Sequence, residues 1–191
     1  TVLAVCGIFV FILWQILPLF NGADVSRSGE MALPAGAKPL ALGIDEWGEI
    51  PFVVRADGSV TFSPISGAAP TSIAIEGVGA TGVAAVSYRP MTQHLAIGTG
   101  DGRLALATVG YEATFKDQVR TIVPSVASGG VYELGDPGRP LSAIAYGDGG
   151  EHKLAAGIQA GAERPRVLAA ILAEKRSMMG PGKIEIGARI E

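Results

Sequence analysis

The chain of 191 residues carries 15 basic and 18 acidic side chains, which gives a formal net charge of -3 and a pI near 5.4. Proteins that bind nucleic acid present a basic face, so this balance argues against DNA or RNA as a partner. The only cysteine, Cys6, lies inside an apolar run, which excludes an internal disulfide and a cysteine-based zinc site. The length that remains after this run suffices for one domain with a hydrophobic core.

The first predicted element is an apolar helix over residues 1–20. The 19 residues from Val2 to Phe20 include no charged side chain. As a helix they extend over roughly 28 Å, close to the hydrocarbon thickness of a bilayer. We therefore predict a transmembrane helix at 1–20 that tethers the protein to the lipid bilayer. Two alternatives remain, a cleaved signal peptide, whose apolar core is shorter, and a core helix buried in a large protein.

Short strands are predicted from residue 39 onward, after a linker at 21–38 that mixes Gly, Ser, Pro and charged side chains without apolar periodicity. Two Asp-Gly pairs, at 57–58 and 101–102, each precede an alternation of polar and apolar residues. Asp-Gly between apolar strands is a strong hairpin signal, because both turn residues must tolerate positive φ. The sequence therefore predicts a β-hairpin around each pair.

The two hairpins belong to one repeated unit. An offset of 44 residues relates the first unit to the second at seven positions, which is hard to obtain by chance. The matched pairs are Leu42 and Val86, Ile44 and Tyr88, Val53 and Ile97, Asp57 and Asp101, Gly58 and Gly102, Val60 and Leu104, and Phe62 and Leu106. A third copy begins at 142–146, which resembles 84–88 at an offset of 58. Its later strands are predicted at 153–158 and 166–173.

A period of about 40 to 45 residues that holds four short strands is typical of a β-propeller blade. In the first unit we expect strands at Pro39 to Ile44, Pro51 to Arg55, Ser59 to Pro64 and Thr71 to Ile75. One blade leaves an apolar face that only neighbouring blades can cover, and propellers close with about four to eight blades. We therefore predict an all-β fold, a partial β-propeller of about three WD40-like four-stranded blades at 39–191, preceded by the transmembrane helix. The alternative is a β-sandwich whose meanders happen to repeat.

An apolar N-terminal helix followed by ALGIDEWGEIPFVVRADGSVTF, HLAIGTGDGRLALATVGYEATF and VRTIVPSV resembles the extended N-terminal region of the long bacterial phosphate ABC-transporter permeases. The resemblance covers residues 2–171, with 96–124 as its most distinctive part. It implies a bacterial inner-membrane protein with its propeller-like region in the periplasm. It also implies other transporter subunits, or a periplasmic substrate-binding protein, as partners. The permease helices of that family have no counterpart in this sequence, so transport itself is expected to belong to partner chains or to a missing part.

The sequence offers little catalytic chemistry. His94 and His152 each fall at the start of the second strand of a repeat without a third ligand in view, which argues against a metal site. Asp57 and Asp101 are not favoured as a pair of catalytic carboxylates, because each belongs to an Asp-Gly turn whose backbone conformation requires such a residue. The glycine-rich run at 98–102 lacks the lysine of a phosphate-binding loop, and a strand follows it in place of a helix. We therefore predict no catalytic residue, no cofactor and no metal, and a protein that is not an enzyme.

Three side chains are candidates for a partner surface: Trp47, Arg103 and Arg120. Trp47 lies between carboxylates in the turn that joins the first two strands of the first unit, and Trp is enriched at interface hot spots. It can equally cover the end of a propeller. The two arginines offer a charged edge to an anion, although isolated cations of strands and loops are usually only solvated surface.

These observations favour one function and leave two alternatives. The first is the non-catalytic, membrane-tethered periplasmic propeller of an ABC-type phosphate transporter permease, with a scaffold or modulatory role in transport. The second is a free-standing anchored propeller that acts as an interaction scaffold in the cell envelope. The third is an anchored propeller enzyme such as a quinone-dependent dehydrogenase. That enzyme needs a cofactor pocket with convergent polar groups, which the sequence does not display.

Overall fold

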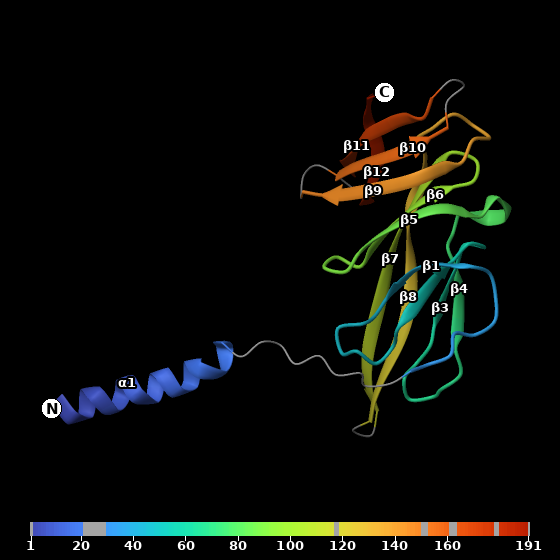
Figure 1. Cartoon of the computed structure of the whole chain (residues 1–191). Coiled ribbons are helices and arrows are strands. Elements are labelled where there is room, and N and C mark those ends of the chain that lie inside the picture. The colour runs from blue at the N-terminus through green and yellow to red at the C-terminus, as the bar shows by residue number, and fades with distance from the viewer. Residues whose placement is uncertain are drawn as a thin grey trace. The chain divides into compact units, whose positions relative to one another are not determined.

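The computed structural model describes residues 2–20, 30–116, 119–149, 153–160, 164–177 and 180–190. Contacts divide the chain into two compact units, Thr1–Ala32 and Leu33–Glu191. The first contains a helix, and the second is built from strands (Figure 1).

The first unit contains the α-helix α1 (Val2–Ile16) and the 3-10 turn η1 (Leu17–Phe20). Every described side chain of α1 is exposed. The α-helix ends before residue 20 because Pro18 lacks an N–H group and disfavours a helical conformation in the residue before it. Among the described residues, no helix combines the length and the apolar character needed to cross a membrane. The transmembrane helix predicted over 1–20 is therefore not found in that form.

The second unit contains three four-stranded antiparallel sheets, in each of which consecutive strands lie side by side (Figure 1). Sheet A consists of β1 (Pro39–Gly43), β2 (Phe52–Arg55), β3 (Ser59–Phe62) and β4 (Thr71–Ala74). After the 3-10 turn η2 (Gly79–Thr81), sheet B consists of β5 (Val83–Arg89), β6 (His94–Thr99), β7 (Arg103–Lys116) and β8 (Val119–Glu133). Sheet C consists of β9 (Leu141–Asp148), β10 (Lys153–Gln159), β11 (Arg166–Ser177) and β12 (Gly180–Ile190). The prediction of a β-rich fold with four-stranded repeats is confirmed.

The strands predicted for the first unit are each found, shorter by one or two residues at an end. The 44-residue repeat is also present in the backbone. Ala56 N donates to Lys38 O, and 44 residues later Gly100 N donates to Gly82 O. The wider spacing between the second and third units is taken up by β7 and β8, which contain 14 and 15 residues. Their pairing continues to Lys116 and Val119, well beyond the length of β6.

Two hydrophobic cores lie between successive sheets. Because side chains of a strand alternate between faces, Leu95 and Ile97 of β6 pack into the core shared with sheet A, while Ala96 between them packs into the core shared with sheet C. The first core also contains Phe52 and Phe62 of sheet A. Sheet B is therefore buried on both faces, and three layers result where a two-sheet sandwich has two.

A buried polar residue ends the second strand of each sheet: Arg55, Thr99 and Gln159, which are 5%, 0% and 0% exposed. Two of them hold the segment that precedes the first strand of their sheet. Arg55 Nη2 and Nη1 donate to the carbonyls of Pro34 (2.6 Å) and Ala37 (2.8 Å). Gln159 Nε2 donates to the equivalent carbonyls of Asp136 (3.1 Å) and Arg139 (2.8 Å).

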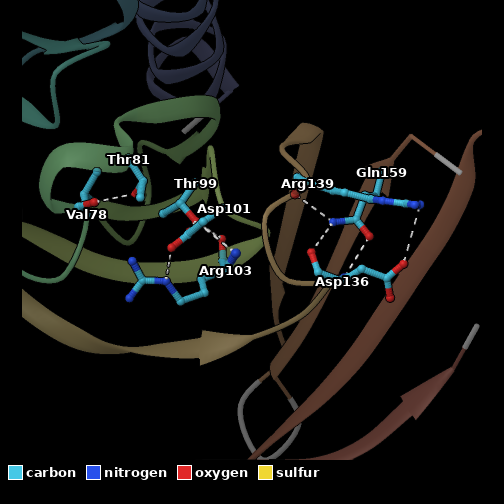
Figure 2. Close-up of polar contacts among 8 residues, drawn as sticks. All are labelled: Val78, Thr81, Thr99, Asp101, Arg103, Asp136, Arg139 and Gln159. Carbon is cyan, nitrogen blue, oxygen red and sulfur yellow. Dashed lines mark hydrogen bonds and ion pairs between the residues drawn. The ribbon is translucent and has the colours of Figure 1, made fainter.

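Sheet B makes the same connection differently, as Figure 2 shows. There Thr81 Oγ1 donates to Val78 O at 2.8 Å, so the segment before β5 is closed by its own side chain. Thr99 is thereby left to hold the β6–β7 turn, where it bonds Asp101 and the backbone of Arg103. Buried polar groups are costly unless they are hydrogen-bonded, and here their bonds fix how one sheet follows another.

Candidate functional site

The loop that carries Trp47 is organised by one buried carboxylate. Asp45 is 3% exposed, and its Oδ1 accepts hydrogen bonds from Glu49 N (2.8 Å) and Ile50 N (2.6 Å). Its Oδ2 accepts a bond from Trp47 N at 3.3 Å. The tight turn requires a positive φ of 71° at Gly48, which glycine adopts without steric cost. Trp47, which is 39% exposed, is therefore presented by a fixed loop between β1 and β2.

Arg120 of β8 lies against this loop. Its Nη2 forms an ion pair with Glu49 Oε1, and its guanidinium carbon lies 5.3 Å from the centre of the Trp47 ring. An arginine within about 6 Å of an indole face is attracted by the ring electrons. Two of the three candidate partner residues, Trp47 and Arg120, are thus brought together although 73 residues separate them, and Glu49 joins them.

Tyr111 of β7 holds the same loop through its hydroxyl, which donates a hydrogen bond to Ile50 O at 3.1 Å. Its ring stands edge-on to Phe62 of the first core, with centroids 6.0 Å apart. Burial raises the pKa of the Tyr111 hydroxyl well above its usual value, and the nearby Asp45 carboxylate raises it further. This hydroxyl is therefore protonated at neutral pH and acts as a structural donor, not as a base.

A groove of about 410 Å³ opens beside Arg120 and Glu49. It lies between the loop before β2, the loop after β3 and the start of β8. Its lining consists of Gly48, Glu49, Ile50, Pro64, Ile65, Ser66, Ala68, Arg120, Thr121 and Ile122. Ile65 is 61% exposed, so an apolar wall stands beside the ion pair. A cation, a carboxylate and an apolar wall in one open groove suit a peptide or protein segment, because interfaces combine apolar contact with a charged rim.

Arg103, the third candidate, is placed elsewhere. Its Nε donates to Asp101 Oδ2 at 2.8 Å within the β6–β7 turn, and it lines no part of the groove. Desolvation is the largest single effect on the pKa of Asp101 and raises it. The hydrogen bonds from Thr99 and Arg103 together outweigh desolvation, so the pKa of Asp101 is lowered. The pKa of Asp57 in the equivalent turn is lowered chiefly by its bonds from Ser59. Both aspartates therefore act as turn acceptors.

His94 lies at the junction of sheets B and C. Its Nδ1 is 3.7 Å from Asp148 Oδ2, and its ring is edge-on to Tyr146 with centroids 5.8 Å apart. Burial raises the pKa of Tyr146 to about 12, so this hydroxyl is not a base at neutral pH. His152, the other histidine considered as a ligand, lies outside the described residues. Within the part of the chain that the structure describes, no three His, Cys, Asp or Glu residues gather as a metal site.

Sequence reasoning singled out Trp47 and Arg120 but not the residues that hold them together. Asp45 and Glu49 appeared only as the acidic surroundings of the tryptophan. An aspartate followed by backbone N–H groups in a Gly-containing turn is the local signal for the role of Asp45. The Glu49–Arg120 pair has no such signal, because it depends on the packing of β8 against the first sheet.

The sequence matches no protein-family model, and no curated protein matches it. Its function is therefore inferred from its residues and their geometry.

Proposed function

We propose that this protein is a non-catalytic, membrane-tethered β-propeller region of an ABC-type phosphate transporter permease, which presents its groove to a partner protein on the periplasmic side of the bacterial inner membrane. Its role is that of a scaffold or modulator of transport. The observation that carries the proposal is the joining of an exposed apolar helix to a series of repeated sheets with an open, charged groove.

The tether in this proposal is the apolar segment at 2–20. Its mean hydropathy is high enough that exposure to water is unfavourable, and its described side chains are exposed, up to 75% for Trp14 and 83% for Phe20. Contiguous apolar surface of this kind marks a contact with lipid or protein. Insertion into the bilayer removes this surface from water, and an indole near the end of the segment suits the membrane interface.

The propeller in this proposal is supported by the stacking of the sheets. Each sheet is a four-stranded meander, and sheets A and B each pack a face on the next sheet. The first strands are in contact in sequence, β1 with β5 and β5 with β9. Neighbouring blades of a propeller are related in this way, with their first strands lining the centre.

The partner is a transporter subunit or a periplasmic substrate-binding protein. The groove supports such a partner because its charged pair is held by a rigid loop, which lowers the entropy lost on binding. The indole beside Arg120 adds the residue types that dominate interface hot spots. Chemistry on a substrate gains no support here, because the two tyrosines with strongly perturbed pKa values are both held protonated.

The test is co-purification from detergent-solubilised membranes of the source cells, with the full chain carrying an affinity tag. We expect transporter subunits or the substrate-binding protein to co-purify with the natural chain. We expect Arg120→Glu to reduce this recovery, since a hot-spot arginine contributes about 2 kcal/mol or more, roughly 30-fold in Kd. Phosphate uptake by the same cells gives the second readout.

The matched control is Arg139→Glu, which makes the same charge change at an arginine that is 46% exposed and lies outside the groove. Recovery of the partner should be unchanged in this variant. If Arg120→Glu behaves like Arg139→Glu, the groove is not the partner surface. If no transporter component co-purifies with the natural chain, the transport role is wrong and the anchored envelope scaffold becomes the better account.

A further inference from the structure

On one face of sheet C, three successive rows across β9, β10 and β11 contain no polar side chain. Residues paired across neighbouring antiparallel strands lie on the same face, so the registers assign this face directly. Its three rows are Ala143, Ile158 and Val167; Ala145, Ala156 and Ala169; and Gly147, Leu154 and Ile171. We call it the outer face of sheet C. It is open, since Val167 is 63%, Leu154 52% and Ile158 39% exposed.

The equivalent face of sheet B is covered. Its rows begin with Ala85, Gly98 and Leu104, followed by Ser87, Ala96 and Leu106. Ala96, Leu104 and Leu106 are at most 6% exposed, because sheet C packs on them. In sheet A the equivalent row contains Phe52 and Phe62, which sheet B covers. This face therefore receives the following sheet in both places where a following sheet is present.

The opposite end of the series carries bonded polar groups on part of its outer face, in a row that also contains Leu42 and Val53. The outer face of sheet A contains Thr61 and Ser72, whose hydroxyl oxygens are 2.9 Å apart. Arg55 Nε donates to Thr61 Oγ1 at 3.0 Å and ties this face to the segment 34–37. The three rows of the outer face of sheet C contain no such groups.

The surface of this face also fits the same kind of cover. A groove of about 260 Å³ runs along Ala143, Ala145, Ala156, Ile158 and Val167. At the junction of sheets B and C, the small Ala96 shares its core with the large side chains of Leu141, Leu168 and Leu172 from sheet C. The alanines of the outer face leave comparable room for large aliphatic side chains.

We infer that the outer face of sheet C is the docking face for a further four-stranded antiparallel sheet of the same repeat, which presents Leu, Ile or Val side chains to the alanine-lined groove. The occupant continues the order A, B, C by one layer. A second copy of this chain fits less well, because the sheet A face that would continue the order in that copy carries Thr61 and Ser72, whose hydroxyls are already bonded to each other and to Arg55. The inference depends on the stacked repeat and not on transport, so either can fail without the other.

The first test measures the accessibility of one thiol. Val167→Cys is made together with Cys6→Ser, and its reaction rate with a maleimide is compared between the purified chain and the membranes of cells that carry the variant gene in place of the natural one. We expect labelling in the membranes to be slower by about tenfold or more, because a covered site reacts only when it opens. The matched control, Met91→Cys with Cys6→Ser, replaces a side chain that is 96% exposed outside the sheets and should label equally in both. Equal rates for Val167→Cys in both preparations would overturn the inference.

The second test identifies the occupant. A photo-crosslinking amino acid replaces Ile158 in the same cells, and the crosslinked peptide is sequenced. We expect a peptide from a further repeat unit, with alternating apolar residues next to an Asp-Gly turn. A peptide from the outer face of sheet C in a second copy of this chain, or from a helical protein, contradicts the inference. Neither result depends on Trp47 or Arg120, so these outcomes are distinguishable from failure of the proposed partner groove.

Discussion

The loop before β2 shows how a single buried carboxylate can position a surface. Asp45 accepts three backbone N–H bonds, and these bonds set where Trp47 and Glu49 meet Arg120. The indole and the guanidinium then lie together without a covalent or metal constraint. The partner surface therefore depends on a residue that is itself 97% hidden from solvent, since Asp45 is 3% exposed.

We expect Asp45→Asn to destabilise the protein by about 1 to 3 kcal/mol, because the amide loses the charge and turns a donor toward one of the backbone N–H groups. The Trp47 side chain should also become more mobile. Urea unfolding and the fluorescence of Trp47, measured with Trp14→Phe in the background, report both effects. Glu46→Gln is the matched control for charge in the same loop, and its stability should stay close to that of the parent. Equal stability of Asp45→Asn and the parent would show that the carboxylate does not organise the loop.

At the scale of elements, the turns between second and third strands also bind the next sheet. In the β6–β7 turn, Gly102 O accepts from Gly135 N at 2.9 Å. Gly102 has a φ of +90°, and a Cβ placed on it would lie 2.5 Å from Asp136 O. The turn glycine is thus required twice, for its backbone conformation and for the close approach of the segment that leads into sheet C.

We expect Gly102→Ala to lower the free energy of unfolding by more than Gly138→Ala does. Gly138 has a similar φ of +76° but open space around its Cβ position, so it carries only the conformational cost, about 1 kcal/mol. Gly102→Ala adds a clash with a backbone carbonyl and should cost roughly 2 to 4 kcal/mol in total. Chemical denaturation of the two variants gives the comparison. Similar losses in both would mean that the junction of sheets B and C yields without strain.

Much of the strand order is local in origin and could be predicted. Asp57-Gly58 and Asp101-Gly102 each mark a hairpin, although only the glycine of each pair, with φ of 82° and 90°, has the positive φ expected of both residues. Alternation on either side fixes which residues face the core. The outer half of the β7–β8 hairpin was not predicted, because it depends on pairing as far as Lys116 and Val119. The same reason applies to the groove, since the approach of Arg120 to Trp47 is a tertiary contact without a sequence signal. The end of α1 at Ile16 follows from Pro18, which the hydropathy of the run obscured.

At the scale of the whole molecule, an exposed apolar helix and a domain built from sheets coexist in one chain. The two parts have opposite surface properties. The described side chains of α1 are apolar and exposed, whereas the large apolar side chains of sheets A and B are mostly buried. The proposed tether can therefore be tested without disturbing the sheets.

We expect the full chain to float with phosphatidylethanolamine and phosphatidylglycerol vesicles, and Phe9→Asp combined with Leu13→Asp to abolish flotation. Each aspartate costs about 3 kcal/mol at the centre of an apolar helix in lipid. The control carries Leu42→Asp and Met91→Asp, the same charge change at positions that are 77% and 96% exposed in the larger unit. This control should still float, with at most the small loss that two added negative charges cause on anionic vesicles. Equal flotation of the helix variant and the natural chain would show that lipid contact does not depend on this segment.

The burial of sheet B on both faces also has a consequence for biosynthesis. Phe52 and Phe62 of sheet A are buried only when Leu95, Ile97 and Ala105, one repeat later in the chain, have been synthesised and packed on them. At a translation rate of about 5 to 20 residues per second, a 44-residue delay corresponds to roughly 2 to 9 s during which the aromatic face of the first sheet has no cover on the ribosome. A longer delay, over an offset of 58 residues, precedes the covering of sheet B by sheet C. We therefore expect the nascent chain to need a holding chaperone between repeats, so that its yield in cells is limited by the time between successive sheets and not by the stability of the finished stack.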